Sequence, residues 1–211
     1  MTKTASRGPG RPPAAKSAQT RGRILHAARE VFGEVGYDAA TFQEIAARAD
    51  LTRPAINHYF ASKLALYRHV VEHTNSVVIA AGLENAAREQ TFTGRIRAFL
   101  GAAVSAKDYD RAAAAFMVTS VLESQRHPEL SSRDTDSLEQ TRQFATAAVR
   151  DGIANGELRP DLDPEAVAEA LVAAFWGLGF YAGFVGDQSH MVTVTAQFMG
   201  LLGDGGWLTG G

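Results

Sequence analysis

The sequence predicts an all-α protein in which an N-terminal domain of short helices precedes a larger helical domain. From Thr20 onward, apolar residues recur at the three-and-four spacing of amphipathic helices. Residues that start and stop helices separate these segments. The 211 residues are enough for one small and one medium domain.

Composition narrows the classes of function. The chain contains no cysteine, which excludes disulfides, a thiol nucleophile and thiolate metal ligands. The N-terminus lacks the apolar segment of a secretory signal, and its prolines oppose the amphipathic helix of a transit peptide. We therefore expect a cytoplasmic protein.

Charge differs sharply between the two parts of the chain. Residues 1–70 carry eleven Lys or Arg against five Asp or Glu, a net charge of +6, whereas residues 71–211 carry ten against eighteen, a net charge of −8. This asymmetry indicates a polyanion-binding module joined to a part that does not bind polyanions, with chance clustering as the alternative.

Residues 1–18 are basic, rich in Pro and Gly, and nearly free of large apolar groups. Such a segment cannot bury enough surface to fold alone, so we expect a flexible basic arm. Gly10-Arg11-Pro12 is similar to the core of hooks that bind the DNA minor groove. The alternative is a tail that is only solvated.

The first helix is predicted from Thr20, with Gly36 as its C-terminal stop. A capping box at 41–44 then starts a second helix that runs to about Arg48. Thr52 is the next N-cap and is expected to accept from the amide of Ala55.

The helix after Thr52 has two different faces. Ile56 and Phe60 lie four residues apart and can pack inward. The opposite face carries Pro54 and His58, flanked by Ala55 and Asn57, with Arg53 at the N-terminal tip. Two short helices of this kind match a helix-turn-helix whose second helix enters the DNA major groove.

The stretch TFQEIAARADLTRPAINHYFASKLALY resembles the DNA-binding region of the TetR (tetracycline-repressor-like) family of bacterial transcription regulators. The matching residues are Thr41, Ile45, Ala46, Ala49, Thr52, Ile56, Phe60, Ser62, Lys63 and Leu66. Five residues depart from the family pattern. Asp50 and Pro54 stand where the family usually has Gly. Asn57 stands where Tyr is usual, Tyr59 where His is usual, and Leu64 where Glu is usual.

The resemblance implies a helix-turn-helix domain over residues 19–66 and a helical effector-binding and dimerisation domain over residues 67–211. It also implies a homodimer that binds a palindromic operator.

The residues of the predicted recognition helix can contact different bases. Arg53 can contact guanine, Asn57 can contact adenine, and Pro54 and Ala55 can contact thymine methyl groups. Thr41 and Lys63 begin helices, where phosphate binds favourably. The full predicted DNA-binding set is Thr41, Thr52, Arg53, Pro54, Ala55, Asn57, His58, Tyr59 and Lys63.

Residues 69–73 fit the H-x-x-E-H pattern of inverted zinc peptidases. A peptidase needs a further ligand and a cleft, so we expect no enzyme, no metal and no cofactor. The alternatives are a metal-dependent hydrolase using His69 and His73, and a helical partner-binding protein without an operator.

A long apolar helix is predicted from Asp163 to Gly186, and a second from about His190 to Leu202. Residues 170–186 are uncharged, and a membrane-spanning helix is one interpretation of such a segment. Acidic residues flank the segment, however, and no basic residue anchors it. We instead expect helices near 164–186 and 190–202 to form the homodimer interface, with Gly179 and Gly183 permitting close approach. Burial within one monomer is the alternative. The stripe expected on the second helix consists of Met191, Val194, Phe198 and Leu201.

Between these parts, helices are predicted near residues 92–106, 111–126 and 136–151. Their aromatic and Met residues could line the family's usual cavity for a small apolar effector, although such residues at helical spacing also form plain core. The predicted lining residues are Phe99, Phe116, Met117, Val121, Phe144 and Trp176. Together these features favour a homodimeric repressor released by a small apolar ligand.

Overall fold

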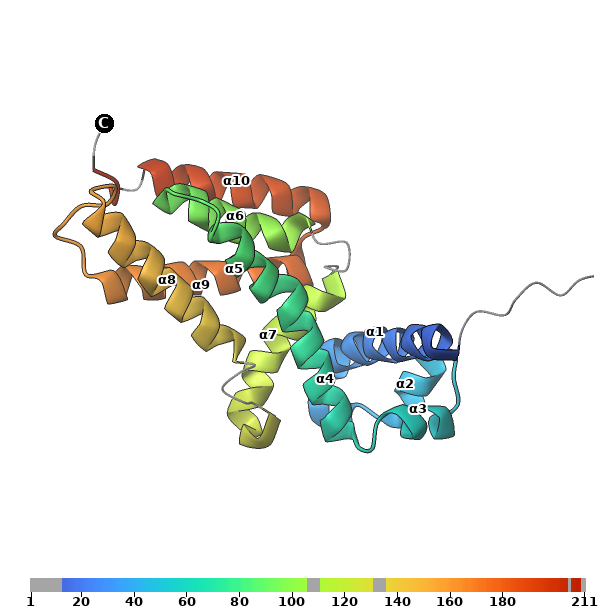
Figure 1. Ribbon diagram of the computed structural model, residues 1–211. Coiled ribbons are helices and arrows are strands. Elements are labelled where there is room, and N and C mark those ends of the chain that lie inside the picture. Colours follow the sequence, from blue (N-terminus) through green and yellow to red (C-terminus); the bar gives the residue numbers. More distant parts are fainter. Residues whose placement is uncertain (1–12, 106–110, 131–135, 205, 210–211) are drawn as a thin grey trace, which may run out of the picture.

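The computed structural model describes residues 13–211 except 106–110, 131–135, 205 and 210–211 (Figure 1). Within these ranges the chain is helical, and its only extended pairing is one bridge between Leu158 and Leu208. The predicted all-α class is confirmed. The helices are α1 Pro13–Ala39, α2 Phe42–Arg48, α3 Arg53–Tyr59, α4 Lys63–Asn75, α5 Ala81–Ala86, α6 Phe92–Ser105, α7 Arg111–Arg126, α8 Ser137–Ala154, α9 Pro164–Phe180 and α10 Gln188–Asp204.

Three short helical turns complete the described part. The π-helical turn η1, Ser76–Ala80, joins α4 to α5, and a second π-helical turn, η4, Tyr181–Val185, continues α9. A 3-10 turn, η2, Pro128–Leu130, follows α7. Single π-helical turns of this kind often occur at functional sites.

Helix α1 begins earlier than the sequence predicted. It starts at Pro13, so residues 13–18, expected in the flexible arm, are helical. Proline is tolerated in a first helical turn, and the alanines that follow it favour the helix. Gly10-Arg11-Pro12 and the rest of the predicted arm lie outside the described residues.

Gly36 interrupts α1 as predicted, with φ at 78°. A Cβ atom there would lie 2.6 Å from a carboxylate oxygen of Glu123. The same oxygen accepts a hydrogen bond of 3.2 Å from the amide of Tyr37. The positive φ therefore favours glycine here, and an added Cβ would also push the Glu123 carboxylate away from the amide of Tyr37.

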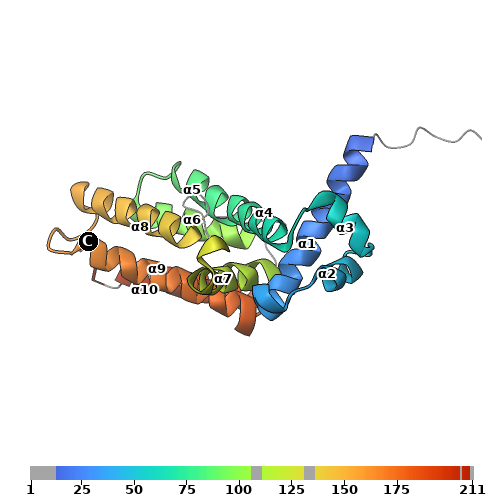
Figure 2. The ribbon, with the colours of Figure 1, turned by 90° about the horizontal axis from the view of Figure 1, so that it is seen from below.

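Two apolar cores divide the molecule. The first lies among α1 to α4 and also contains Phe116 from α7 and Leu130 from η2. It follows α4 as far as Val71, past the boundary expected at residue 66. Figure 2 shows this helix-turn-helix end projecting from the larger bundle, with α1 beside α7.

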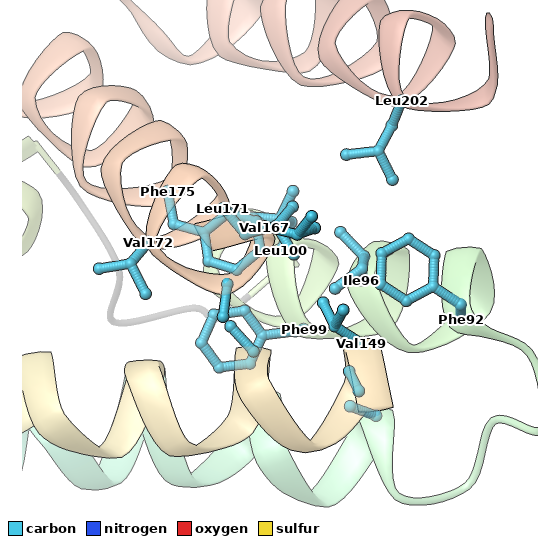
Figure 3. Close-up of a cluster of buried hydrophobic side chains, with 14 of the residues drawn as sticks. Phe92, Ile96, Phe99, Leu100, Val149, Val167, Leu171, Val172, Phe175 and Leu202 are labelled. Carbon is cyan, nitrogen blue, oxygen red and sulfur yellow. The ribbon is translucent and has the colours of Figure 1, made fainter. Parts of the chain in front are cut away.

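The second core fills the bundle of α5 to α10. Figure 3 shows Phe99 of α6 and Phe175 of α9 among its side chains. Residues 164–185 are long and apolar enough to cross a membrane by length and composition. One such helix is weak evidence, because core helices pass the same test. In α9, Leu171 and Phe175 are buried in the bundle.

Two details expected for the subunit interface are corrected. Gly183 is buried against α7 of its own chain, where an added Cβ would lie 2.6 Å from the amide nitrogen of Ala115. Gly179 likewise faces Val118 of α7. On α10, Phe198 packs on the bundle core whereas Leu201 is 71% exposed. The residues of the expected stripe therefore do not all lie on one exposed face of the helix. The close approach at Gly183 therefore lies within one subunit, whereas at Gly179 an added Cβ would lie at an ordinary contact distance of 3.6 Å from Val118.

Candidate DNA interface and effector cavity

The caps of the helix-turn-helix hold its two helices as the sequence predicted. The hydroxyl of Thr41 accepts from the amide of Glu44 at 3.2 Å, at the start of α2. The hydroxyl of Thr52 accepts from the amide of Ala55 at 3.4 Å, at the start of α3. Pro54 follows in the first turn of α3, where its missing amide has no intrahelical partner.

The turn between α2 and α3 explains one departure from the family pattern. Asp50 adopts a φ of 51°, the left-handed conformation for which glycine is usual. Aspartate tolerates this conformation better than most residues. Arg23 of α1 donates to the carbonyl oxygen of Asp50 at 3.1 Å and lies 3.4 Å from its carboxylate. It also donates to the carbonyl of Ala49, so α1 fixes the turn.

Helix α3 presents a polar face to solvent. Ile56 and Phe60 are buried as predicted, while Arg53, Asn57 and His58 are exposed. Within the described part of the chain, neither Arg53 nor Asn57 has a side-chain hydrogen bond or ion pair. The other members of this face are Pro54, which is exposed, and Ala55 and Tyr59, which are half-buried. The ring of Tyr59 lies against His58, with centroids 5.4 Å apart.

Lys63 has a different environment from the one predicted for a phosphate contact. Its ammonium donates to three carbonyl oxygens at the end of α1 and beyond: 2.7 Å to Tyr37, 3.0 Å to Asp38 and 3.2 Å to Ala40. The same nitrogen lies 4.5 Å from the centroid of the Tyr37 ring. An ammonium has three N–H donors, and all three are used. In this conformation Lys63 ties α4 to α1 and has no donor for phosphate.

Replacing Lys63 by Met is therefore expected to lower the free energy of unfolding by about 1–3 kcal/mol, because hydrogen bonds from a charged donor are lost while the aliphatic stem remains. Urea unfolding measures this change, and Arg126→Met, on the exposed end of α7, is the control. We expect the salt dependence of DNA binding to stay unchanged. An unchanged stability together with a salt slope lower by about one per subunit would restore the phosphate role.

A polar cluster connects the DNA-binding end to α7. His127 Nε2 lies 3.1 Å from the carboxylate of Asp38, and Nδ1 lies 3.3 Å from that of Glu129. The hydrogen bond to Asp38 raises the pKa of His127. Arg68 of α4 donates to the carbonyl of Glu129 at 2.7 Å. These contacts join α1 and α4 to η2 and to His127, which directly follows α7.

The bundle contains an apolar cavity of about 70 Å³ between α6, α7, α8, α9, α10 and η1. Three residues predicted from the sequence line it: Phe99, Met117 and Trp176. Phe144 lies behind Phe99, with stacked rings 4.5 Å apart. The cavity is also lined by residues that were not predicted from the sequence: Val78, Ile79, Leu100, Val118, Thr141, Phe175, Leu178, Gly179, Met191 and Thr195.

Two predicted lining residues lie elsewhere. Phe116 is buried in the first core, 5.5 Å from Tyr67 between ring centroids. Successive residues of a helix point about 100° apart, so Phe116 faces α1 and α4 while Met117 faces the bundle. Val121 lines a smaller pocket beside Tyr67. Part of the cavity wall that was not predicted could have been found from the sequence, because Phe175, Leu178 and Gly179 recur at helical spacing along α9.

The two histidines of the hydrolase alternative lie on the surface of α4. His69 Nδ1 is 3.3 Å from Glu72, and its ring contacts Phe60 with centroids 5.7 Å apart. His73 is exposed. Among the residues that the structure describes, no group of three His, Asp or Glu could hold a metal ion.

Comparisons with known proteins agree with this geometry. The family model for bacterial regulatory proteins of the tetR family matches residues 24–70, and the model for the C-terminal part of BetI-type transcriptional repressors matches residues 92–198. The transcriptional activator FasR of Mycolicibacterium smegmatis is 42% identical over 74 residues, which are 35% of this chain and 33% of FasR. The regulator YezE of Bacillus subtilis is 28% identical over 174 residues, covering 80% of this chain and 88% of YezE.

Among solved structures, the ketosteroid transcriptional regulator KstR2 of Mycobacterium tuberculosis shares the fold. Its TM-score is 0.71 at 22% identity, over 90% of this chain and 95% of KstR2. The hydrolase alternative is not favoured, since the relatives are transcription regulators. The chain belongs to the TetR family and is a DNA-binding transcription regulator.

Proposed function

We propose that this regulator is a cytoplasmic homodimeric repressor, without enzymatic activity, that leaves its operator when a small apolar molecule binds the helical bundle. The observation that carries this proposal is the solvent-facing side of α3, where the side chains of Arg53 and Asn57 have no partner within the described residues. A dimer presents two such helices, so its operator is a palindrome with half-sites one helical turn, or a multiple of it, apart.

Each side chain on this face has a chemical role in the proposal. Arg53 can donate two hydrogen bonds to O6 and N7 of guanine, and Asn57 can pair with N6 and N7 of adenine. Pro54 and Ala55 offer apolar surface to thymine methyl groups. Tyr59 takes a contact to the DNA backbone. Thr41 and Thr52 stand at the N-termini of α2 and α3, where their hydroxyls and the first, uncapped amide of each helix can donate to phosphate oxygens.

Exposed apolar surface supports dimerisation through α9 and α10, which contact each other. A stripe at spacings of three and four residues runs along the exposed side of α9 and η4; it consists of Ala166, Ala170, Ala173, Gly177, Phe180 and Phe184. Val192 and Leu201 of α10 are also more than half exposed. Clustered apolar surface of this kind marks interaction sites. The small residues at 166–177 allow a second helix to approach closely.

The effector step follows from the position of the cavity. Val78 and Ile79 of η1 line it, and η1 directly continues α4. The first residue of α4 is Lys63, which holds the end of α1. A ligand that enlarges the cavity displaces η1 and α4 and favours a dimer whose two α3 helices no longer match the half-site spacing. The shift is limited by the ligand's difference in affinity for the two conformers.

Footprinting on operators selected from random DNA, combined with sedimentation, tests this proposal. We expect a twofold-symmetric footprint and a dimer. Gly177→Leu should convert the protein to a folded monomer that binds the operator only at higher concentration, since nothing lies within 4 Å of an added Cβ there in the subunit. If the parent protein is a monomer and binds one unpaired half-site, the proposed dimer is contradicted. A fully dimeric Gly177→Leu variant would place the interface on another face.

A further inference from the structure

The cavity in the bundle combines apolar walls with very few polar groups. The residues that line it include no Asp, Glu, Lys, Arg or His. Phe99, Phe175 and Met117, which are among its walls, are each at least nine-tenths buried. An ion in such a place would lose its hydration without an opposite charge to replace it. The cavity therefore selects an uncharged molecule.

One of the lining residues has an unused hydrogen-bond donor. Trp176 lines the cavity, and its indole Nε1 is buried without a hydrogen-bond partner among the described residues. The indole nitrogen can only donate. Buried polar groups in native proteins are nearly always paired, so an unpaired donor beside a cavity requires an explanation.

A second polar group next to the cavity is already engaged. Thr141 is 1% exposed, and its hydroxyl donates to the carbonyl oxygen of Ser137 at 2.6 Å. Its hydrogen is thus used within α8, and only the oxygen remains as an acceptor. Thr195, on α10, lies on the same cavity wall. Trp176 is therefore the lining residue with a buried, uncommitted N–H.

From this arrangement we infer that the effector is a neutral, largely apolar molecule with one hydrogen-bond acceptor, such as a ketone or ester carbonyl, that binds the indole N–H of Trp176. The inference rests on the proposed effector function and adds the chemical class of the ligand. The volume of about 70 Å³ is smaller than the 150 Å³ or so of a cavity that holds benzene. The indole nitrogen of Trp176 is covered in this conformation. Met117 and Met191 lie in the wall, and their unbranched side chains can change rotamer to admit one or two rings and to uncover that nitrogen.

The test uses 1-indanone, its hydrocarbon indane and the anion indane-1-carboxylate as probes. The chain has two tryptophans, so the spectrum of the ¹⁵N-labelled protein contains two indole N–H signals, and Trp176→Phe assigns them. We expect 1-indanone to move the Trp176 signal downfield, toward a hydrogen-bonded position, and to leave that of Trp207 in place. Indane should bind without this shift, and the carboxylate should not bind.

Affinities give a second, independent readout. In the parent protein 1-indanone should bind about tenfold more tightly than indane, because one hydrogen bond in a dry site contributes roughly that factor. In Trp176→Phe, which keeps an aromatic ring and loses the N–H, this preference should disappear. The inference is overturned if the Trp176 signal does not move, if the preference survives in Trp176→Phe, if the carboxylate binds as well as the ketone, or if the ketone does not bind up to its solubility limit.

These measurements involve no DNA, so they separate the inference from the proposed function. If 1-indanone binds at Trp176 and the protein still binds its operator, the inference about ligand chemistry is supported. The proposal that this class of effector releases the operator is then contradicted. Loss of operator binding caused by 1-indanone, with an unmoved Trp176 signal, would keep the ligand-responsive function and overturn the role of Trp176.

Discussion

Replacing Arg53 by Ala is expected to weaken operator binding by about 1–3 kcal/mol per half-site, and thus by roughly 2–6 kcal/mol for a dimer on a palindrome. The guanidinium is exposed and has no partner among the described residues, so its removal should leave the fold intact. The loss should also relax the preference for the guanine that it contacts. Fluorescence anisotropy with operator variants changed at one position per half-site measures both effects.

Arg53→Lys is the matched control for this experiment. Lysine keeps the positive charge but lacks the planar fork that binds guanine at two atoms. The salt dependence of binding should therefore stay close to that of the parent while base preference falls. Asn57→Ala should act in the same way at a different base pair. If Arg53→Ala leaves the ranking of operator variants unchanged, Arg53 is not a base reader and the specificity lies elsewhere on α3.

Replacing Gly183 by Ala should be among the most damaging single changes to the fold. The added Cβ would lie 2.6 Å from the amide nitrogen and 2.7 Å from the Cα of Ala115, and backbone cannot move aside as a flexible side chain can. Arg111 of α7 also donates to the carbonyl oxygens of Gly183 and Phe184, at 3.1 Å each. We expect the free energy of unfolding to fall by at least about 1–3 kcal/mol, the usual cost of overpacking. Urea unfolding is the measurement.

Gly22→Ala is the control for the Gly183 experiment. It lies inside α1, away from the proposed subunit interface, is exposed, and has nothing within 4 Å of an added Cβ. Alanine there should stabilise the helix by roughly 0.5–1 kcal/mol. The loss caused by Gly183→Ala should not be recovered at higher protein concentration, because it arises within one subunit. Equal stability of the Gly183→Ala variant and the parent would show that α7 and η4 can separate without cost.

The helix-turn-helix was predictable because its signals are local. Thr52 caps the amide of Ala55, three residues away, and Ile56 and Phe60 share a face because they are one helical turn apart. Gly36 interrupts α1 through its own backbone conformation. Each of these features depends on residues within about four positions, so the sequence was sufficient to place them.

The cavity and the ties between helices depend on which distant segments meet. Lys63 binds carbonyl groups that lie more than twenty residues earlier in the chain. Phe116 and Met117 are neighbours in sequence, yet one completes the first core and the other lines the cavity.

The sequence by itself determined the fold class, the helices of the DNA-binding domain and the residues on the outer face of α3. The tertiary structure alone decided that Lys63 joins α4 to α1, that Gly183 packs within the subunit, and that Trp176, whose indole N–H has no partner among the described residues, lines the cavity. The reason is physical. Hydrophobic spacing fixes which face of a helix is buried, but not which partner covers that face, since burial is not directional and many partners satisfy it equally well.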